Sequence, residues 1–290
     1  MKTVFISLAC VAFACRVSAQ SNSVLHHPES INTDGKYLYV SDIGKELAPT
    51  EKDGDGAIRK YTLDGRLVKA NITSEKLNAP KGSAIIKGVI YVADLDRVVG
   101  ISLANGRKVA EFSLAEFKTG FSNDIAAKDD HTIFVSLTDV GKIVEIDIHA
   151  KTMHEVAVPE IKGANGLVFD PNANRLYVCT FAGDAANPAG VIGMIGWDRD
   201  GHVFYEKAAD VNGMFDGIAL AADHRLIVSD WVAFDKAAGI LRKVDLDTRM
   251  ATTVDLPLIA GPADFCYSAA KNMLYIPVMV EGKILIRELK

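Results

Sequence analysis

Four oxygen-bearing residues occupy the same place in four similar segments of the sequence. They are Glu29 in "PES", Asn123 in "SND", Asn165 in "ANG" and Asp216 in "FDG", each at the entrance to a strand-like apolar run. Asn and Asp are poor strand formers, so their recurrence at strand entrances requires a reason. Carboxylate and amide oxygens, with no cysteine or histidine in the set, are the ligands that calcium accepts, whereas zinc prefers nitrogen or sulfur. The four residues therefore predict a site for calcium or another divalent cation.

These residues belong to a longer repeat that combines a short loop, an apolar stretch, a turn and a second strand of the type "LYVSD". The copies span residues 28–42, 80–94, 122–137, 164–180, 215–230 and 263–278. Equivalent positions lie 42 to 52 residues apart, at 29, 81, 123, 165, 216 and 264. Each interval holds about four strand signals, separated by turn residues such as "DG" and "NG". Four strands per repeat is one propeller blade, so we predict an all-β, six-bladed β-propeller.

The chain's two ends are expected to complete the ring. The last copy supplies only three strands before Lys290, and "SNSVLHH" at 21–27 is the expected donor of the fourth. Pairing of the N- and C-terminal strands would leave no exposed sheet edge there. The alternative architecture, a β-sandwich followed by a second small β domain, does not explain the even spacing.

In a propeller the six equivalent positions converge near the central axis. The two remaining copies contribute Lys81 and Asp264, which we regard as additional site residues, and Asp124 adjoins Asn123. The Lys81 ammonium could approach the site and compete with a cation, or extend into solvent, and we favour solvent. Asp264 is an extra potential ligand, and Asp124 could tune the site from behind. Any single Asn or Asp could equally be a plain turn residue, but the recurrence of Glu, Asn, Asn and Asp at one phase favours a shared site.

The sequence resembles the senescence marker protein and gluconolactonase family, also called regucalcins, and more distantly diisopropyl fluorophosphatase and the paraoxonases. The resemblance rests on "PE" in the first copy, Asn in the third, "NG" in the fourth and "DG" in the fifth. It implies that Glu29, Asn123, Asn165 and Asp216 hold a divalent metal at the tunnel mouth. The family's first motif is usually "EGP", whereas Ser30 and Ile31 follow Glu29 here, so the lining near the first blade is expected to differ.

This resemblance also implies a calcium-dependent hydrolase of lactones or activated esters. The metal would act as a Lewis acid, and Asp216 would be the general base or the nucleophile. Two other functions remain open at this stage. One is a propeller that binds a small ligand or a protein without catalysis, since a fold does not fix a function; the other is a strictosidine-synthase-like or lyase enzyme.

The N-terminus and the composition limit where the protein works. A basic start, an apolar run and small residues before Gln20 predict a signal peptide over residues 1–19, followed by a single domain at 20–290 that is secreted or periplasmic. With a net charge of −5 and no basic cluster, we expect no nucleic-acid partner. We also expect no stable membrane insertion, a monomer, and two buried thiols at Cys179 and Cys266.

Overall fold

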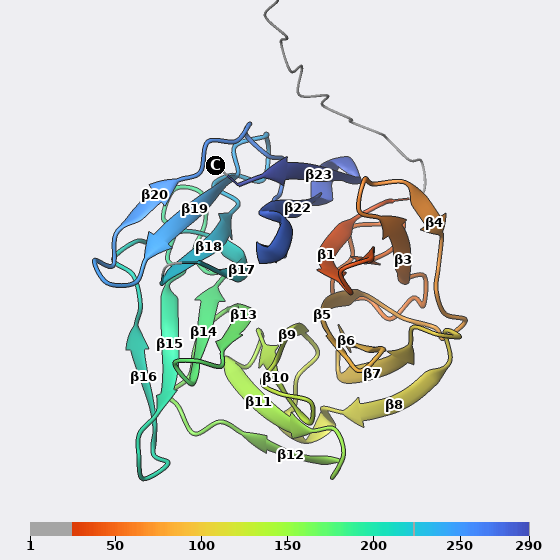
Figure 1. The fold of residues 1–290 in the computed structure, drawn as a ribbon, viewed down its shortest axis with the longest axis horizontal. Helices are drawn as coiled ribbons and strands as arrows, with labels where there is room; N and C mark the ends of the chain where they lie inside the picture. The colour runs from red at the N-terminus through yellow and green to blue at the C-terminus, as the bar shows by residue number, and fades with distance from the viewer. Residues whose placement is uncertain (1–24, 223, 290) are drawn as a thin grey trace, which may run out of the picture.

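The computed structural model describes residues 25–222 and 224–289 as six antiparallel β-sheets arranged around a common axis (Figure 1). Five sheets have four strands, and the sixth has three within these residues. Apart from three short 3-10 turns, the described regular structure is entirely β. The predicted all-β, six-bladed propeller is therefore confirmed.

The strands of each sheet pair in chain order, and β1, β5, β9, β13 and β17 lie nearest the axis of the first five blades (Figure 1). Blade one contains β1 (Pro28–Thr33), β2 (Tyr37–Asp42), β3 (Ala57–Thr62) and β4 (Leu67–Lys69). Blade two contains β5 (Pro80–Ile86), β6 (Val89–Asp94), β7 (Arg97–Ser102) and β8 (Lys108–Ser113), followed by η1 (Ala115–Phe117). Blade three contains β9 (Ser122–Ala127), β10 (Thr132–Leu137), β11 (Lys142–Asp147) and β12 (Thr152–Glu155). Blade four contains β13 (Ala164–Asp170), β14 (Arg175–Thr180), β15 (Ile192–Trp197) and β16 (Val203–Lys207). Blade five contains β17 (Phe215–Ala221), β18 (Arg225–Asp230), β19 (Ile240–Asp245) and β20 (Ala251–Thr253). Blade six contains β21 (Cys266–Ser268), η2 (Ala269–Lys271), β22 (Met273–Val278), η3 (Met279–Glu281) and β23 (Lys283–Glu288).

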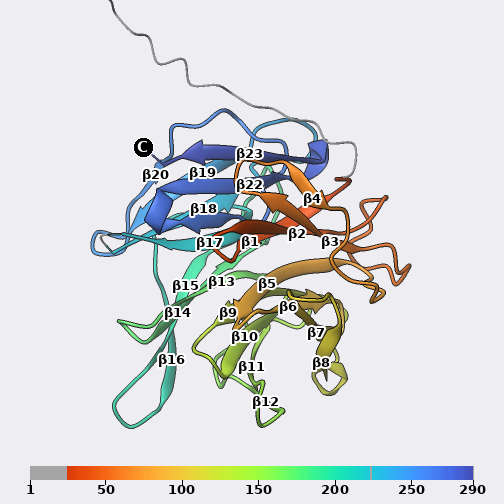
Figure 2. The same ribbon diagram turned by 45° about the vertical axis from the view of Figure 1, so that its right-hand side comes forward.

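Blade six lies beside blade one in both views (Figures 1 and 2). Their inner backbones pair directly, because the Ile31 amide donates to the Asp264 carbonyl at 3.2 Å and the Asp264 amide donates to the Glu29 carbonyl at 2.9 Å. The strand predicted to complete blade six lies mostly outside the described residues, and residues 25–27 themselves contain no strand. The predicted signal peptide at 1–19 also lies outside them.

Side chains alternate between two hydrophobic cores along each strand, as the two-residue period of a strand requires. In β10, Ile133 and Val135 face the core shared with blade two, whereas Phe134 faces the core shared with blade four. The molecule is thus held together by a ring of separate cores between neighbouring blades. A single strand stabilises two interfaces at once.

Each innermost strand of the first five blades begins with a register irregularity. In β17, Asp216 and Gly217 together oppose Ser229, and in β13, Asn165 and Gly166 together oppose Cys179. Such bulges turn a side chain away from the regular pleat. They explain how Asn and Asp can stand within a strand, where the sequence had suggested an entrance loop.

A small hydrogen-bonding side chain lies opposite several of these bulges. Ser136 Oγ donates to the Asn165 carbonyl at 2.6 Å, and Ser229 Oγ donates to the Ala263 carbonyl at 3.1 Å. Cys179 Sγ occupies the equivalent place in blade four and lies 3.1 Å from the Asp216 carbonyl. These three contacts tie blades three, four and five to the inner segment of the next blade.

Three aspartates at the ends of second strands, Asp42, Asp94 and Asp230, form what we call the aspartate clamps. Each carboxylate accepts hydrogen bonds from the backbone of the segment that leads into its blade, and each also accepts a hydrogen bond from an arginine side chain. In blade one, Asp42 accepts the amides of His26 and His27 at 3.1 and 2.9 Å. It also accepts Arg59 Nε at 2.6 Å. The clamps therefore fix the chain just before the residues that line the axis.

Among the described residues, no helix is long and apolar enough to cross a membrane. Cys179 and Cys266 are both free thiols, as expected; Cys179 is buried, whereas Cys266 is only half-buried.

Candidate functional site

A cavity of about 360 Å³ opens at the end of the axis where the innermost strands begin. We call it the site cavity. Its charged and amide-bearing lining residues come from five blades: Glu29, Lys81, Asn123, Asn165 and Asp216. The structure thus brings the four residues predicted as metal ligands to one place, although residue 29 is separated from residue 216 by most of the chain. Each of the four is at most 5% exposed.

All four predicted ligands carry an oxygen that no hydrogen bond satisfies. Seven buried side-chain polar atoms among the described residues lack a partner, and four of these are Glu29 Oε2, Asn123 Oδ1, Asn165 Oδ1 and Asp216 Oδ1. Buried polar atoms without partners are costly and uncommon in folded proteins. Two carboxylates and two amide oxygens around one cavity form a donor set that fits a hard divalent cation such as calcium.

Asp216 is held in a fixed orientation by an indole. Trp231 Nε1 donates to Asp216 Oδ2 at 2.7 Å, and both side chains are buried. This bond leaves Oδ1 as the carboxylate oxygen without a hydrogen-bond partner. Strand β18 ends at Asp230, an aspartate of the clamps that accepts the Met214 amide. Trp231 is the next residue, so the clamp also fixes the backbone that carries the indole.

The electrostatics of the site favour protonated carboxyls in the absence of a cation. Burial raises the pKa of Asp216 to about 7, although the hydrogen bond from Trp231 opposes the shift. Burial, reinforced by the nearby charge of Asp216, raises the pKa of Glu29 well above its ordinary value, with Lys81 acting in the opposite direction. A divalent cation at this place would offset both the desolvation and the repulsion.

Lys81 does not extend into solvent, so this expectation was wrong. Its side chain is 1% exposed, and Nζ donates to the carbonyls of Pro49 and Ala79 at 2.7 and 3.0 Å. The ammonium also lies 4.7 Å from the centre of the Phe121 ring. Burial lowers its pKa to about 8, with Glu29 opposing the shift. Two backbone carbonyls and an aromatic face thus replace water around the charge, which is why the lysine can remain inside.

Asp124 and Asp264 line a different space, a cavity of about 240 Å³ further along the inner strands, which we call the inner cavity. Asp124 accepts the backbone amides of Ile125 and Leu167, both at 2.6 Å, and so links blade three to blade four. Asp264 Oδ2 accepts the Ser30 hydroxyl at 2.5 Å and links blade six to blade one. Burial raises the pKa of Asp124 to about 6. Neither residue lines the site cavity. The residue of blade six that lines it is Met279.

Two glycines that follow site residues allow the inner strands to pack closely. A Cβ on Gly166 would come within 2.4 Å of the Asp216 carbonyl oxygen, and a Cβ on Gly217 within 2.6 Å of Asp264 Cα. The "NG" and "DG" pairs at 165–166 and 216–217 are therefore not hairpin turns. They are places where the backbone of the next blade occupies the position of a side chain.

From the sequence, Trp231 and Phe234 could line a substrate pocket because they follow the second strand of blade five, whereas Phe181 was not singled out. Phe181, Trp231 and Phe234, which we call the aromatic wall, lie with ring centres 5.5 to 5.9 Å apart and all line the cavity. The sequence offered ordinary packing between blades as the simpler interpretation of Trp231 and Phe234. Their position directly after the second strand of blade five was the only available signal.

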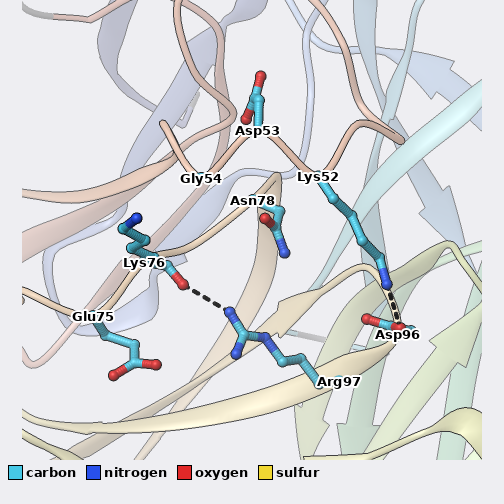
Figure 3. Close-up of a pocket in the computed structure, with 8 residues that line it drawn as sticks. All are labelled: Lys52, Asp53, Gly54, Glu75, Lys76, Asn78, Asp96 and Arg97. Carbon is cyan, nitrogen blue, oxygen red and sulfur yellow. Dashed lines mark hydrogen bonds and ion pairs between the residues drawn. The ribbon is translucent and has the colours of Figure 1, made fainter.

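A second depression, of about 430 Å³, is lined by the connections between strands of blades one and two (Figure 3). Several of its polar groups already have partners: Lys52 Nζ lies 2.6 Å from Asp96 Oδ2, and Arg97 Nη2 donates to the Lys76 carbonyl at 2.7 Å. None of its lining residues is buried. We therefore assign the functional site to the site cavity.

Comparisons with known proteins agree with the fold. No family model and no curated protein sequence matches the chain. Among solved structures, a catalytically inactive variant of virginiamycin B lyase from Staphylococcus aureus with quinupristin has a TM-score of 0.60 and 15% identity, covering 91% of this chain and 95% of that one. A streptogramin B lyase has a TM-score of 0.60 and 14% identity, with 92% and 94% covered.

An auxiliary nutrient binding protein from Bacteroides ovatus has a TM-score of 0.67 and 12% identity, covering 91% of this chain and 70% of that one. At these identities the likeness shows the propeller fold alone. Enzymes and a binding protein both occur among the neighbours, and membership of the gluconolactonase family stays a prediction.

Proposed function

We propose that this protein is an exported, calcium-dependent hydrolase of lactones or activated esters. The observation that carries the proposal is the set of four buried oxygens without hydrogen-bond partners, supplied by Glu29, Asn123, Asn165 and Asp216 to one cavity. Calcium held by them would supply a Lewis acid that stabilises negative charge on a substrate oxygen. An exported protein meets calcium concentrations at which even a weak site is filled, and extracellular modules bind with Kd of about 0.1 to 1 mM.

Asp216 is the residue best placed to do chemistry. Its Oδ2 is fixed by Trp231, its Oδ1 has no hydrogen-bond partner, and the residue lines the site cavity. As a base, this carboxylate takes a proton from water while the water oxygen bonds to the ester carbonyl carbon. The bond from that carbon to the alcohol oxygen then breaks, and the proton passes to the departing alkoxide, which leaves an acid and an alcohol. As a nucleophile, the same oxygen would form an acyl-enzyme that water hydrolyses.

The other residues of the cavity bind and orient. Asn123 and Asn165 present neutral oxygens from neighbouring blades, and the Lys81 ammonium brings positive charge to the same space. The aromatic wall and Met279 exclude water from one side, which strengthens electrostatic interactions inside the cavity.

The proposal is tested by calcium titration and by assay. We expect 5 mM calcium chloride to raise the Tm of the wild-type protein, and the Asp216→Asn variant to lose this rise and its activity on a panel of aldonolactones, alkyl lactones and aryl esters. Asp64→Asn, a change at a surface aspartate, is the matched control. If calcium leaves the wild-type Tm unchanged, the metal site is wrong. If calcium binds but no substrate is hydrolysed, the site serves ligand binding or an elimination reaction such as that of a lyase.

A further inference from the structure

We infer that the site cavity accepts an ester or lactone with an apolar alkyl or aryl body, in preference to a polyhydroxylated sugar lactone. The inference rests on the proposed function and names its substrate class. It comes from the two apolar walls of the cavity, which are built from three segments distant in sequence.

The first wall is the aromatic wall. Phe181 packs against Trp231 with ring centres 5.8 Å apart in an edge-to-face arrangement, and Phe234 lies 5.5 Å from Trp231. Trp231 offers a ligand only its ring, because its N–H is bonded to Asp216. Phe234 remains 53% exposed although it lines the cavity. An exposed phenylalanine at a cavity mouth is typical of a surface that a ligand covers.

The second wall is the blade-one insertion between β2 and β3, residues 43–56, which we call the mouth loop. The loop is rich in charged residues, yet its residues that line the cavity are Ile43, Leu47 and Pro49. Leu47 is 48% exposed, so it is available to a ligand. The loop is anchored at the cavity by the bond from Lys81 Nζ to the Pro49 carbonyl.

Few polar groups remain for a sugar. Thr138 lines the cavity, but its Oγ1 already donates to the Ala164 carbonyl at 2.6 Å. Lys81 has three N–H donors and uses two of them on carbonyls. If the four free oxygens hold a cation, the remaining side-chain donors of the lining are the third N–H of Lys81 and the amide N–H groups of Asn123 and Asn165. The aromatic wall and the lining residues of the mouth loop offer no free donor, so sugar hydroxyls placed against them would lose their water without replacement, whereas an alkyl chain would gain from burial.

The test compares kcat/KM for a series of δ-lactones with C-alkyl substituents of increasing length, in the presence of calcium, with that for glucono-δ-lactone. Each added methylene should raise kcat/KM by about threefold until the cavity is filled, in line with the transfer of methylene groups out of water. The longest lactone of the series should exceed the sugar lactone by about 100-fold. A higher kcat/KM for glucono-δ-lactone would overturn the inference and leave the hydrolase proposal standing.

A variant of Phe234 tests whether the aromatic wall causes the preference for alkyl substrates. Phe234→Ser should lower kcat/KM about tenfold for the longest alkyl lactone and less than twofold for unsubstituted δ-valerolactone. Val109→Ser is the matched control, since Val109 is 57% exposed on β8 and does not line the site cavity. An equal loss for long and short substrates, or the same loss in the control, would contradict the assignment of the wall.

Binding without turnover separates this inference from the proposed function. The non-hydrolysable lactam 6-pentylpiperidin-2-one should quench tryptophan emission with at least tenfold higher affinity than gluconolactam, and Trp231→Phe should abolish the signal. If the alkyl lactam binds and no ester is hydrolysed, the apolar specificity stands and the hydrolase fails. If neither lactam binds better than the other, the apolar specificity is wrong whatever the enzyme hydrolyses.

Discussion

Two groups of buried acidic residues share the same blades, with Glu29 and Asp42 in blade one and Asp216 and Asp230 in blade five, yet they are built differently. The aspartate clamps satisfy their oxygens with backbone amides and an arginine, as Asp230 does with Met214 and Arg242. Glu29 and Asp216 each retain an oxygen without a partner. Burial of a carboxylate is therefore no sign of function by itself; the informative feature is an oxygen that the protein leaves unsatisfied.

The largest effect is expected when an aspartate of the clamps is removed. Asp42→Ala should lower the free energy of unfolding by about 3–5 kcal/mol, because it leaves Arg59 buried without its carboxylate. Urea unfolding without calcium measures the loss. The same loss should appear with calcium present, since the clamp lies outside the proposed metal site. A loss below about 1 kcal/mol would show that the clamps are not structural.

Neutralising a carboxylate of the site should leave the metal-free stability intact and remove the stabilisation by calcium. Asp216→Asn removes a buried charge, and an amide oxygen can still accept from Trp231, so metal-free stability should stay equal or rise. The calcium-dependent stabilisation, about 2.7 kcal/mol at a concentration 100 times Kd, should disappear. Urea unfolding at matched calcium concentrations gives both values. A strong loss of metal-free stability would place Asp216 with the clamps.

Lys81 lies between the two groups, because it is buried and bonded to two backbone carbonyls yet lines the site cavity. Lys81→Met should lower stability by about 1–3 kcal/mol, since the carbonyls of Pro49 and Ala79 lose their donor. Calcium should bind severalfold more tightly once the neighbouring positive charge is gone. Lys142→Met, which removes an outer-strand pair with Glu155, is the control and should change neither value appreciably. Weaker calcium binding by Lys81→Met would contradict this role of its charge.

The pH dependence sharpens the comparison further. The pKa of Asp216 rises from 3.8 to about 7 in the folded protein, and that of Glu29 rises in the same direction. The metal-free folded state therefore binds more protons than the unfolded state, so this stability contribution is full below about pH 4 and is lost as the pH rises through 7. Calcium should restore it, so the calcium-induced rise in Tm should be about 2–4 °C larger at pH 8 than at pH 5. Calorimetry at both pH values tests this, and equal rises would contradict it.

The smallest effect is expected at Cys179. Cys179→Ser should change the free energy of unfolding by less than about 1 kcal/mol, because serine fills the equivalent place in blades three and five and can donate to the Asp216 carbonyl. Cys179→Val should cost more, since that carbonyl would lose its donor. Thermal unfolding compares the two. A larger loss for serine than for valine would show that the sulfur matters for packing and not for its hydrogen bond.

Much of this architecture follows from patterns that repeat along the sequence. The spacing of the "LYVSD" copies predicted six blades, and the phase of Glu29, Asn123, Asn165 and Asp216 predicted their convergence, because equivalent positions on successive blades face one axis. Asp264 shows the limit of that reasoning. It shares the phase, but β21 begins only at Cys266, and the residue turns toward the inner cavity and Ser30.

The remaining features depend on contacts between segments that no repeat relates. Lys81 stays inside because a carbonyl of the mouth loop, 32 residues earlier, accepts a hydrogen bond from its Nζ. The aromatic wall joins Phe181 of blade four to Trp231 and Phe234 of blade five. Such placements depend on the lengths and paths of individual loops, which hydrophobic periodicity does not encode.

The close packing at Gly166 and Gly217 bears on how a substrate enters the site cavity and how the product leaves it. These glycines bring adjacent inner strands together next to Asn165 and Asp216, and the site cavity and the inner cavity have different lining residues. We therefore expect a molecule that enters the site cavity beside the mouth loop to leave by the same opening. An acid product that stays bound to a cation there would block the opening through which the next substrate enters. We therefore expect the product to be a competitive inhibitor.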